Sequence, residues 1–341
     1  MRPDWADAVP ERDDSVLPFL AASGWGGAQR MPLAGDASGR RYERLRLGNR
    51  SAILMICPAE AAAVAARFER IAAWLRSCGF SAPQVWGRTA DGLLICEDFG
   101  DALFSRILAA EPDRADALYL PAVGVLAAIG RFASPDGLEV FDAERLCGLV
   151  REVAHWYTDV APARKGAALS DSLEALLAGL RPLDAVAKVT SLRDFHAGNL
   201  VWLGRRRGLR RVGLLDFQDA VLAHPAYDLF SLLSDARLDV PEATRLRGLR
   251  AFADETGTDP EGLQTDFRLI GVQRCARILG IFARLARRDR KPVYLEHCPR
   301  VWAQMTRNAD AVDPRGLGTA LRAAFPEPDD AMLSRLREAV P

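Results

Sequence analysis

The sequence predicts an α+β protein with two lobes, a small β-rich lobe over residues 1–98 and a larger, mostly helical lobe over residues 99–341. Short apolar runs separated by turn residues dominate the first part, whereas apolar residues recur at helical spacing through most of the second. With 341 residues, 49% of them hydrophobic, the chain is long enough for two domains and can bury a substantial core. Segregated strands and helices are typical of the α+β class.

The N-terminal lobe is expected to begin with a short helix over residues 15–24. Ser15 suits the N-cap of this helix, and Pro18 is tolerated in a first turn. A turn at residues 35–39 separates two strands, and the Ala-rich segment 59–78 has the apolar spacing of a long helix. Five strands are expected. The first is short and starts at residue 31, and the other four cover residues 42–47, 51–57, 84–87 and 93–96.

The second lobe is expected to be helical except for one β-hairpin. The hairpin strands are predicted at residues 200–203 and 212–215, where apolar residues flank an Arg-rich turn that is expected to be solvated. The expected helices are 103–110, 115–133, 143–156, 170–180, 227–233, 241–255, 260–288, 299–308, 317–325 and 330–339.

The charge balance argues against a nucleic-acid or membrane-surface binder, because Lys+Arg and Asp+Glu are equal at 45 each. No apolar run approaches the roughly 20 residues that span a bilayer. The acidic, Pro-interrupted start is unlike a signal peptide, so we expect a soluble, cytoplasmic protein. The six cysteines have no metal-ligand spacing and are expected to be reduced, most of them buried.

The segment over residues 192–228, called the catalytic segment below, is expected to carry the chemistry, with the catalytic loop at residues 192–199. Asp194 is followed five residues later by Asn199, and Asp216 follows the second predicted hairpin strand. Phosphoryl transfer requires a carboxylate at the acceptor hydroxyl and oxygen ligands for a magnesium ion that holds the nucleotide phosphates. Three ordinary turn residues at strand ends are the alternative, but the order and spacing favour a kinase with Asp194 as the base and with Asn199 and Asp216 at the metal.

Several phrases resemble the aminoglycoside phosphotransferase-like kinases, and within them the anomeric N-acetylmuramate and N-acetylglucosamine 1-kinases of bacterial cell-wall recycling. The resemblance spans about residues 15–310. Its main phrases are Gly35-Asp-Ala-Ser-Gly-Arg-Arg-Tyr, Glu97-Asp-Phe-Gly-Asp, Arg193-Asp-Phe-His-Ala-Gly-Asn-Leu and Leu215-Asp-Phe-Gln-Asp-Ala. The resemblance implies a protein-kinase-like bilobal fold, ATP and Mg²⁺ as cofactors, and an enzyme that phosphorylates a small sugar at C1. We expect a monomer, although the sequence does not determine the oligomeric state. The sequence leaves open the preferred sugar and anomer, and the choice of ATP or GTP.

The nucleotide site is expected to depart from the kinase pattern, because no Lys precedes Lys165 and Met55 stands near the usual strand lysine. The phosphates then require backbone amides or Arg. The resemblance also places the inter-lobe hinge at Glu97 and Phe99. The amide candidates are Asp36, Ala37, Ser38 and Gly39, and the guanidinium candidates are Arg40 and Arg41, for which solvated strand positions are the alternative.

The acceptor candidates are His196, Gln218, Arg277 and Trp156. His196 contacts the sugar or holds the loop, and Gln218 can bond substrate or water. Trp156 suits a sugar face but also an ordinary core position. On one long predicted helix, Arg274, Arg277 and Arg284 share helical spacing, and a lactyl carboxylate would suit one of them, with internal salt bridges as the alternative.

The role expected for Asp228 is structural, and two alternative functions of the protein remain open. Asp228, at the start of a helix, is expected to anchor the catalytic loop through backbone amides rather than to act chemically. A kinase of the same family for an aminoglycoside, choline or another alcohol is the first alternative function. A nucleotide-binding pseudokinase is the second, because the strand lysine is missing and Leu192 replaces a frequent His.

Overall fold

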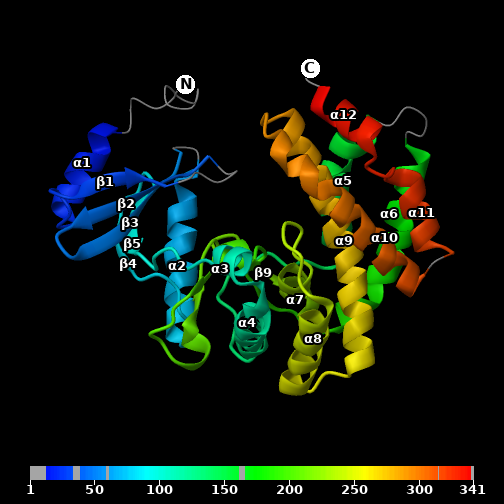
Figure 1. The fold of residues 1–341 in the computed structure, drawn as a ribbon, viewed down its shortest axis with the longest axis horizontal. Helices are drawn as coiled ribbons and strands as arrows, with labels where there is room; N and C mark the ends of the chain where they lie inside the picture. Colours follow the sequence, from blue (N-terminus) through cyan, green and yellow to red (C-terminus); the bar gives the residue numbers. More distant parts are fainter. Residues whose placement is uncertain (1–12, 34–38, 59–60, 161–165, 314, 339–341) are drawn as a thin grey trace.

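A computed structural model describes residues 13–33, 39–58, 61–160, 166–313 and 315–338. A five-stranded antiparallel sheet lies at one end of the molecule, and most of the helices are packed at the other (Figure 1). The strands have the order β1-β2-β3-β5-β4 and comprise β1 (Gln29–Pro32), β2 (Arg41–Leu47), β3 (Arg50–Ile56), β4 (Val85–Arg88) and β5 (Leu93–Glu97). The β-rich N-terminal part that the sequence predicts is therefore confirmed.

The sheet is covered on both faces, because its strands alternate two sets of apolar side chains. Helix α1 (Asp13–Ala22) contributes Val16 and Leu20 to a cluster that includes Leu54 of β3. Helix α2 (Ala63–Ser77) packs Phe68 on the other face, in the same cluster as Met55. Met55, near the place of the usual strand lysine, is thus a core residue that is 1% exposed.

The remainder of the chain is mainly helical. Helix α9 (Pro260–Arg287) is 28 residues long; its N-cap, Asp259, accepts a hydrogen bond from the Gly262 amide at 2.7 Å. Around it pack helices from both sides of the catalytic segment (Figure 1). The other helices are α3 (Phe104–Ala110), α4 (Ala115–Ile129), α5 (Ala143–Thr158), α6 (Ala167–Leu180), α7 (Ala226–Leu233), α8 (Glu242–Thr256), α10 (Cys298–Val312), α11 (Leu317–Ala324) and α12 (Asp330–Glu338).

Two small antiparallel sheets interrupt the helices and present the catalytic segment. One is the predicted hairpin, formed by β7 (Leu200–Trp202) and β8 (Val212–Leu214). The other pairs β6 (Val189–Ser191) with β9 (Val221–Ala223), which the sequence did not predict. Together they hold residues 192–199 and 215–220 between paired strands, so the two functional loops leave a fixed scaffold.

Most predicted helices are confirmed, with shifts at their ends. Helix α4 stops at Ile129 rather than at residue 133, and α5 and α10 each extend beyond the expected end. The six cysteines are free thiols, and all but Cys78 are buried, as expected. Within the described ranges, no helix combines the length and apolar character needed to cross a membrane.

Candidate functional site

The catalytic loop is anchored by the buried carboxylate of Asp228, at the start of α7. Its two oxygens accept hydrogen bonds from the Ser191 hydroxyl at 2.7 Å and from the backbone amides of Leu192 and Arg193 at 2.6 and 3.1 Å. Asp228 is 4% exposed. The predicted structural role of Asp228 is therefore confirmed, since three donors converge on it immediately before Asp194.

The backbone around Asp194 is held in an uncommon conformation. Arg193 has φ of 69°, in the left-handed region that side chains other than Gly rarely adopt. The Asn199 side-chain amide donates to the Asp194 carbonyl at 2.9 Å, and the Leu192 carbonyl accepts from the Asp194 amide at 2.9 Å. These bonds and the Asp228 anchor compensate for the strain and fix the direction of the Asp194 carboxylate.

The electrostatic surroundings keep Asp194 ionised. Burial alone would raise the pKa of Asp194, but the nearby guanidinium groups of Arg193, Arg274 and Arg277 and the His196 ring outweigh it and lower the pKa. Asp194 is therefore available as a carboxylate at neutral pH, which is the form that can accept a proton.

Asn199 and Asp216 lie side by side, as the sequence predicts. The Asn199 Nδ2 atom donates to Asp216 Oδ2 at 3.4 Å. Asp216 has φ of 58°, a second left-handed position, which turns its side chain out of the strand direction set by β8. A carboxylate and an amide oxygen donor within reach of each other suit a hard divalent cation, which prefers oxygen ligands.

Arg40 and Gln218 both bind the Asp216 carboxylate. The Arg40 Nη2 and Gln218 Nε2 atoms each donate to Asp216 Oδ1 at 2.9 Å. Arg40 is 7% exposed and Gln218 is 3% exposed. Arg41, in contrast, lies 3.5 Å from Glu43 on its own strand. The structure thus separates the two guanidinium candidates: Arg40 extends from the sheet to the catalytic segment.

The neighbouring residues support this arrangement. Phe217 is fully buried and stacks on Phe68 of α2, with ring centroids 4.8 Å apart. This contact ties the Asp216 loop to the β-rich lobe. Gly39, with φ of 75°, precedes Arg40. The other three amide candidates, Asp36, Ala37 and Ser38, lie outside the described residues.

The expected hinge contacts the β7–β8 hairpin through Arg206, a residue of the Arg-rich turn. Arg206 donates to Glu97 Oε1 at 2.5 Å and to the Ser81 hydroxyl at 2.8 Å, and its guanidinium lies 5.0 Å from the Phe99 ring centroid. The expectation of a solvated turn is wrong for Arg206, because strand pairing brings the turn of the hairpin beneath the segment that joins the lobes.

Beside Asp194 is a cavity of about 120 Å³ between the catalytic loop, the end of α7 and α9. His196 lines it, and the His196 Nδ1 atom accepts from the Gly198 amide at 3.2 Å. His196 therefore holds the loop and also faces the cavity. Its contact with a sugar stays a prediction. The remaining lining includes Arg237, Arg274, Asp235, Ile278, Ile281 and Phe282.

Arg277 and Trp156 lie differently with respect to Asp194. The Arg277 guanidinium is near enough to Asp194 to lower its pKa, and it donates to the Tyr227 hydroxyl at 3.5 Å. Trp156 does not line the cavity; its carbonyl accepts from Arg287 Nη1 at 2.9 Å and its ring lies 5.6 Å from that guanidinium. Packing between α5 and α9 explains the position of Trp156 better than contact with a ligand at this cavity.

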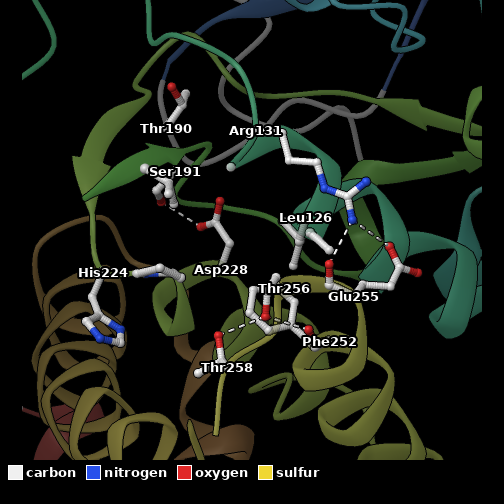
Figure 2. A pocket seen from close by; sticks show the side chains of 14 residues that line it. Leu126, Arg131, Thr190, Ser191, His224, Asp228, Phe252, Glu255, Thr256 and Thr258 are labelled. Carbon is white, nitrogen blue, oxygen red and sulfur yellow. Dashed lines mark hydrogen bonds and ion pairs between the residues drawn. The ribbon is translucent and has the colours of Figure 1, made fainter. Parts of the chain in front are cut away.

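A second cavity, of about 230 Å³, lies behind the catalytic loop between β6, α4 and α8. Figure 2 shows the Asp228 carboxylate turned towards Ser191 at its edge, with the Arg131–Glu255 pair on the other side. The cavity borders the anchor of the catalytic loop and does not include Asp194, Asn199 or Asp216.

Fold and site together define a protein-kinase-like phosphotransferase. The Asp194 carboxylate lines a cavity, and the neighbouring Asn199 and Asp216 side chains lie close to Arg40 of the β-rich lobe. The chain belongs to the phosphotransferase enzyme family, whose model matches residues 30–264. It is an enzyme that transfers a phosphoryl group.

The sequence is similar to two proteins named N-acetylmuramate/N-acetylglucosamine kinase. The protein from Caulobacter vibrioides is 38% identical over 334 residues, covering 86% of this chain and 92% of the relative. The protein from Pseudomonas aeruginosa is 30% identical over 301 residues, covering 84% and 87%.

Solved structures support the fold at low sequence identity. The ADP-bound aminoglycoside phosphotransferase APH(2'')-Ib has a TM-score of 0.61 at 12% identity, covering 88% of this chain and 99% of that one. A gentamicin complex of APH(2'')-IIa has a TM-score of 0.61 at 13% identity, covering 85% and 97%. The expected protein-kinase-like fold is thereby confirmed.

Because the pKa of Asp228 is raised, we expect the free energy of unfolding to depend on pH. Burial raises the pKa of Asp228 to about 6, against the opposing hydrogen bonds from Ser191 and Leu192. A carboxyl whose pKa is higher in the folded state stabilises the fold below its unfolded pKa, near 4, and loses that contribution as the pH rises through about 6. Relative to an Asp228→Asn variant, the unfolding free energy of the wild type should fall by about 3 kcal/mol over this interval.

Urea unfolding of both proteins between pH 4 and pH 7 measures this difference. Parallel pH profiles of the two proteins would contradict the assignment of the titration to Asp228. A difference that increases with pH would show the opposite sign of the pKa shift.

Proposed function

We propose that this enzyme transfers the γ-phosphoryl group of ATP to the anomeric C1 hydroxyl of N-acetylmuramate and N-acetylglucosamine, in peptidoglycan recycling in the cytoplasm. The observation that carries the proposal is the meeting of Asp194, Asn199 and Asp216, with Asp194 lining the cavity, in a chain 38% identical to a kinase named for these two sugars. We further propose that residues 1–98 hold the nucleotide, residues 99–341 hold the acceptor, and the enzyme acts as a monomer.

Asp194 is the proposed base. Its lowered pKa keeps it ionised, and it lines the cavity in which the sugar would sit. The anomeric hydroxyl would donate its proton to Asp194 as the new O–P bond forms and ADP departs. The loop bonds to Asp228 and Asn199 hold the carboxylate in one direction, which favours an in-line approach of the hydroxyl.

Asn199 and Asp216 are the proposed Mg²⁺ ligands. Together they offer one carboxylate and one amide oxygen as ligands. This fits magnesium in a kinase, because the ion commonly takes one or two carboxylates and completes its coordination with phosphate oxygens and water. When bound, Mg²⁺ neutralises the phosphate charge that develops during transfer.

The nucleotide is proposed to lie between the sheet and the catalytic segment. The backbone near Glu97 and Phe99 would contact the base, while the side chains of these residues are held by Arg206. Gly39 and its preceding amides, Asp36 to Ser38, would cover the phosphates, with Arg41 at the rim.

Arg40 is the proposed replacement for the strand lysine. Its guanidinium already reaches Asp216, so a bound triphosphate would offer it a second anionic partner. Arg40→Ala should raise the KM for ATP by about 10- to 100-fold, because charged hydrogen bonds of this kind are lost. A coupled ADP-release assay measures this constant.

Arg41→Ala is the matched comparison, since Arg41 is adjacent but pairs with Glu43. We expect it to change the KM for ATP much less. If Arg41→Ala raised the KM and Arg40→Ala did not, the phosphate contact would belong to Arg41.

The acceptor side is proposed to use His196 and Arg277 directly and Gln218 indirectly, through its bond to Asp216. Trp156 would contribute only if the sugar extends along α5. Three of the guanidinium groups near Asp194, those of Arg193, Arg274 and Arg277, make this region positively charged. Such a charge disfavours cationic acceptors such as choline or aminoglycosides.

An acceptor panel tests the proposed function. Purified enzyme with Mg²⁺ and ATP is offered both amino sugars, glucose, choline and an aminoglycoside, and ADP release is followed for each. Phosphorus NMR then locates the new phosphate. We expect turnover with the two amino sugars and phosphate at C1. Preferential use of choline or the aminoglycoside, phosphate at another carbon, or absence of acceptor-dependent ADP release would each contradict the proposal.

A further inference from the structure

Two arginines of α9, Arg277 and Arg284, form no ion pair with a carboxylate in the described part of the chain, although Asp194 and Asp289 lie near enough to interact with them electrostatically. Arg277 has only the 3.5 Å bond to the Tyr227 hydroxyl, and Arg284 forms no hydrogen bond or ion pair with a described residue. The Nε atoms of both are buried without a hydrogen-bond partner. Arg274, by contrast, lies 4.3 Å over the Tyr227 ring.

Both guanidinium groups are held in unfavourable surroundings. Burial lowers the pKa of Arg277, and Arg193 and Arg274 lower it further. Burial likewise lowers the pKa of Arg284, with Arg288 as a second cause, and together they outweigh the opposing charge of Asp289. Partly desolvated cations beside other cations cost free energy, which the binding of an anion would offset.

The two residues lie on one side of α9, along a line that leads away from the catalytic loop. Arg274, Ile278 and Ile281 of the same helix line the cavity with Asp194. Seven residues separate Arg277 from Arg284, which is about two helical turns or roughly 10 Å. An acceptor with its reacting hydroxyl at Asp194 would therefore extend along α9 past Arg277 towards Arg284.

We infer that Arg277 and Arg284 form a carboxylate subsite, and that Arg284 sets the preference for an acidic over a neutral amino sugar. This inference rests on the proposed function. The two proposed sugars share the ring, the acetamido group and the anomeric hydroxyl, but only N-acetylmuramate carries a lactyl carboxylate. A guanidinium can bind such a carboxylate through two parallel N–H donors.

The two arginines differ in how they can be tested. Arg277 affects the pKa of Asp194, so its removal would change turnover of both sugars. Arg284 lies about two helical turns beyond Arg277 on α9, further from Asp194. Substitution of Arg284 therefore separates recognition of the carboxylate from the chemistry at C1.

The experiment measures kcat and KM for both sugars with the wild type, Arg284→Gln and Arg284→Lys. Arg268→Gln is the control, because Arg268 lies on the opposite side of the same helix from Arg277. For Arg284→Gln we expect kcat/KM for N-acetylmuramate to fall by about 10- to 100-fold, mainly through KM, with N-acetylglucosamine unaffected. Arg284→Lys should recover part of the loss, and Arg268→Gln should leave both sugars unchanged.

The outcomes separate the inference from the function on which it rests. Equal losses for both sugars, or no loss for either, with Arg284→Gln would overturn the subsite while leaving the kinase intact. A wild type that phosphorylates neither sugar would overturn the proposed function and the subsite with it. Calorimetric titration with each sugar gives a readout independent of turnover, and Arg284→Gln should weaken binding of the acid sugar alone.

Discussion

Replacing Asp194 with asparagine is expected to lower turnover by about 10²- to 10⁴-fold while leaving a folded protein. Asparagine has nearly the same shape but cannot accept the acceptor proton. The loop should keep its conformation, because Asn199 bonds the backbone carbonyl of residue 194 and Asp228 bonds the preceding amides. The measurement is kcat at saturating ATP and sugar.

Two further measurements distinguish the loss of the catalytic base from a loss of folded structure. The melting temperature and ATP affinity of Asp194→Asn should remain close to those of the wild type, since the proposed nucleotide and metal contacts lie elsewhere. An Asp194→Asn enzyme with near wild-type turnover would eliminate Asp194 as the base. A variant that also failed to bind ATP would point to a structural defect.

The catalytic segment could be predicted from the sequence because its information is local. Asp194 and Asn199 lie five residues apart on one loop, and the β7–β8 hairpin brings Asp216 beside them. The anchoring role of Asp228 was also predictable, since a carboxylate at the start of a helix can accept hydrogen bonds from the backbone amides of a neighbouring loop. In each case short-range spacing was sufficient to place the atoms.

Contacts between segments far apart in the chain could not be predicted from the sequence. The β6–β9 sheet consists of two three-residue strands, which are too short to show periodicity. Arg206 lies in a turn, where solvation is the usual expectation, yet it bonds a residue 109 positions earlier in the chain. The choice between Arg40 and Arg41 depends on which side of β2 faces the catalytic segment, and the sequence alone does not give that orientation.

Asp216→Asn should lower turnover by at least about 10²-fold and shift the Mg²⁺ requirement to higher concentration. The loss of the carboxylate removes the charged ligand from the proposed metal site, while the asparagine can still accept a hydrogen bond from Gln218. Turnover measured across a series of Mg²⁺ concentrations, at fixed ATP and sugar, reports both effects.

Asp219→Asn provides the matched control for Asp216, because Asp219 also accepts from Gln218, at 3.2 Å, but is directed towards Arg67 of α2. A loss of charge near the loop should act through both residues, whereas loss of a metal ligand should act only through Asp216. We therefore expect Asp219→Asn to retain the wild-type dependence on Mg²⁺. If the two variants lost turnover equally, with unchanged Mg²⁺ dependence, Asp216 would contribute through the local network of Arg40 and Gln218 rather than as a ligand.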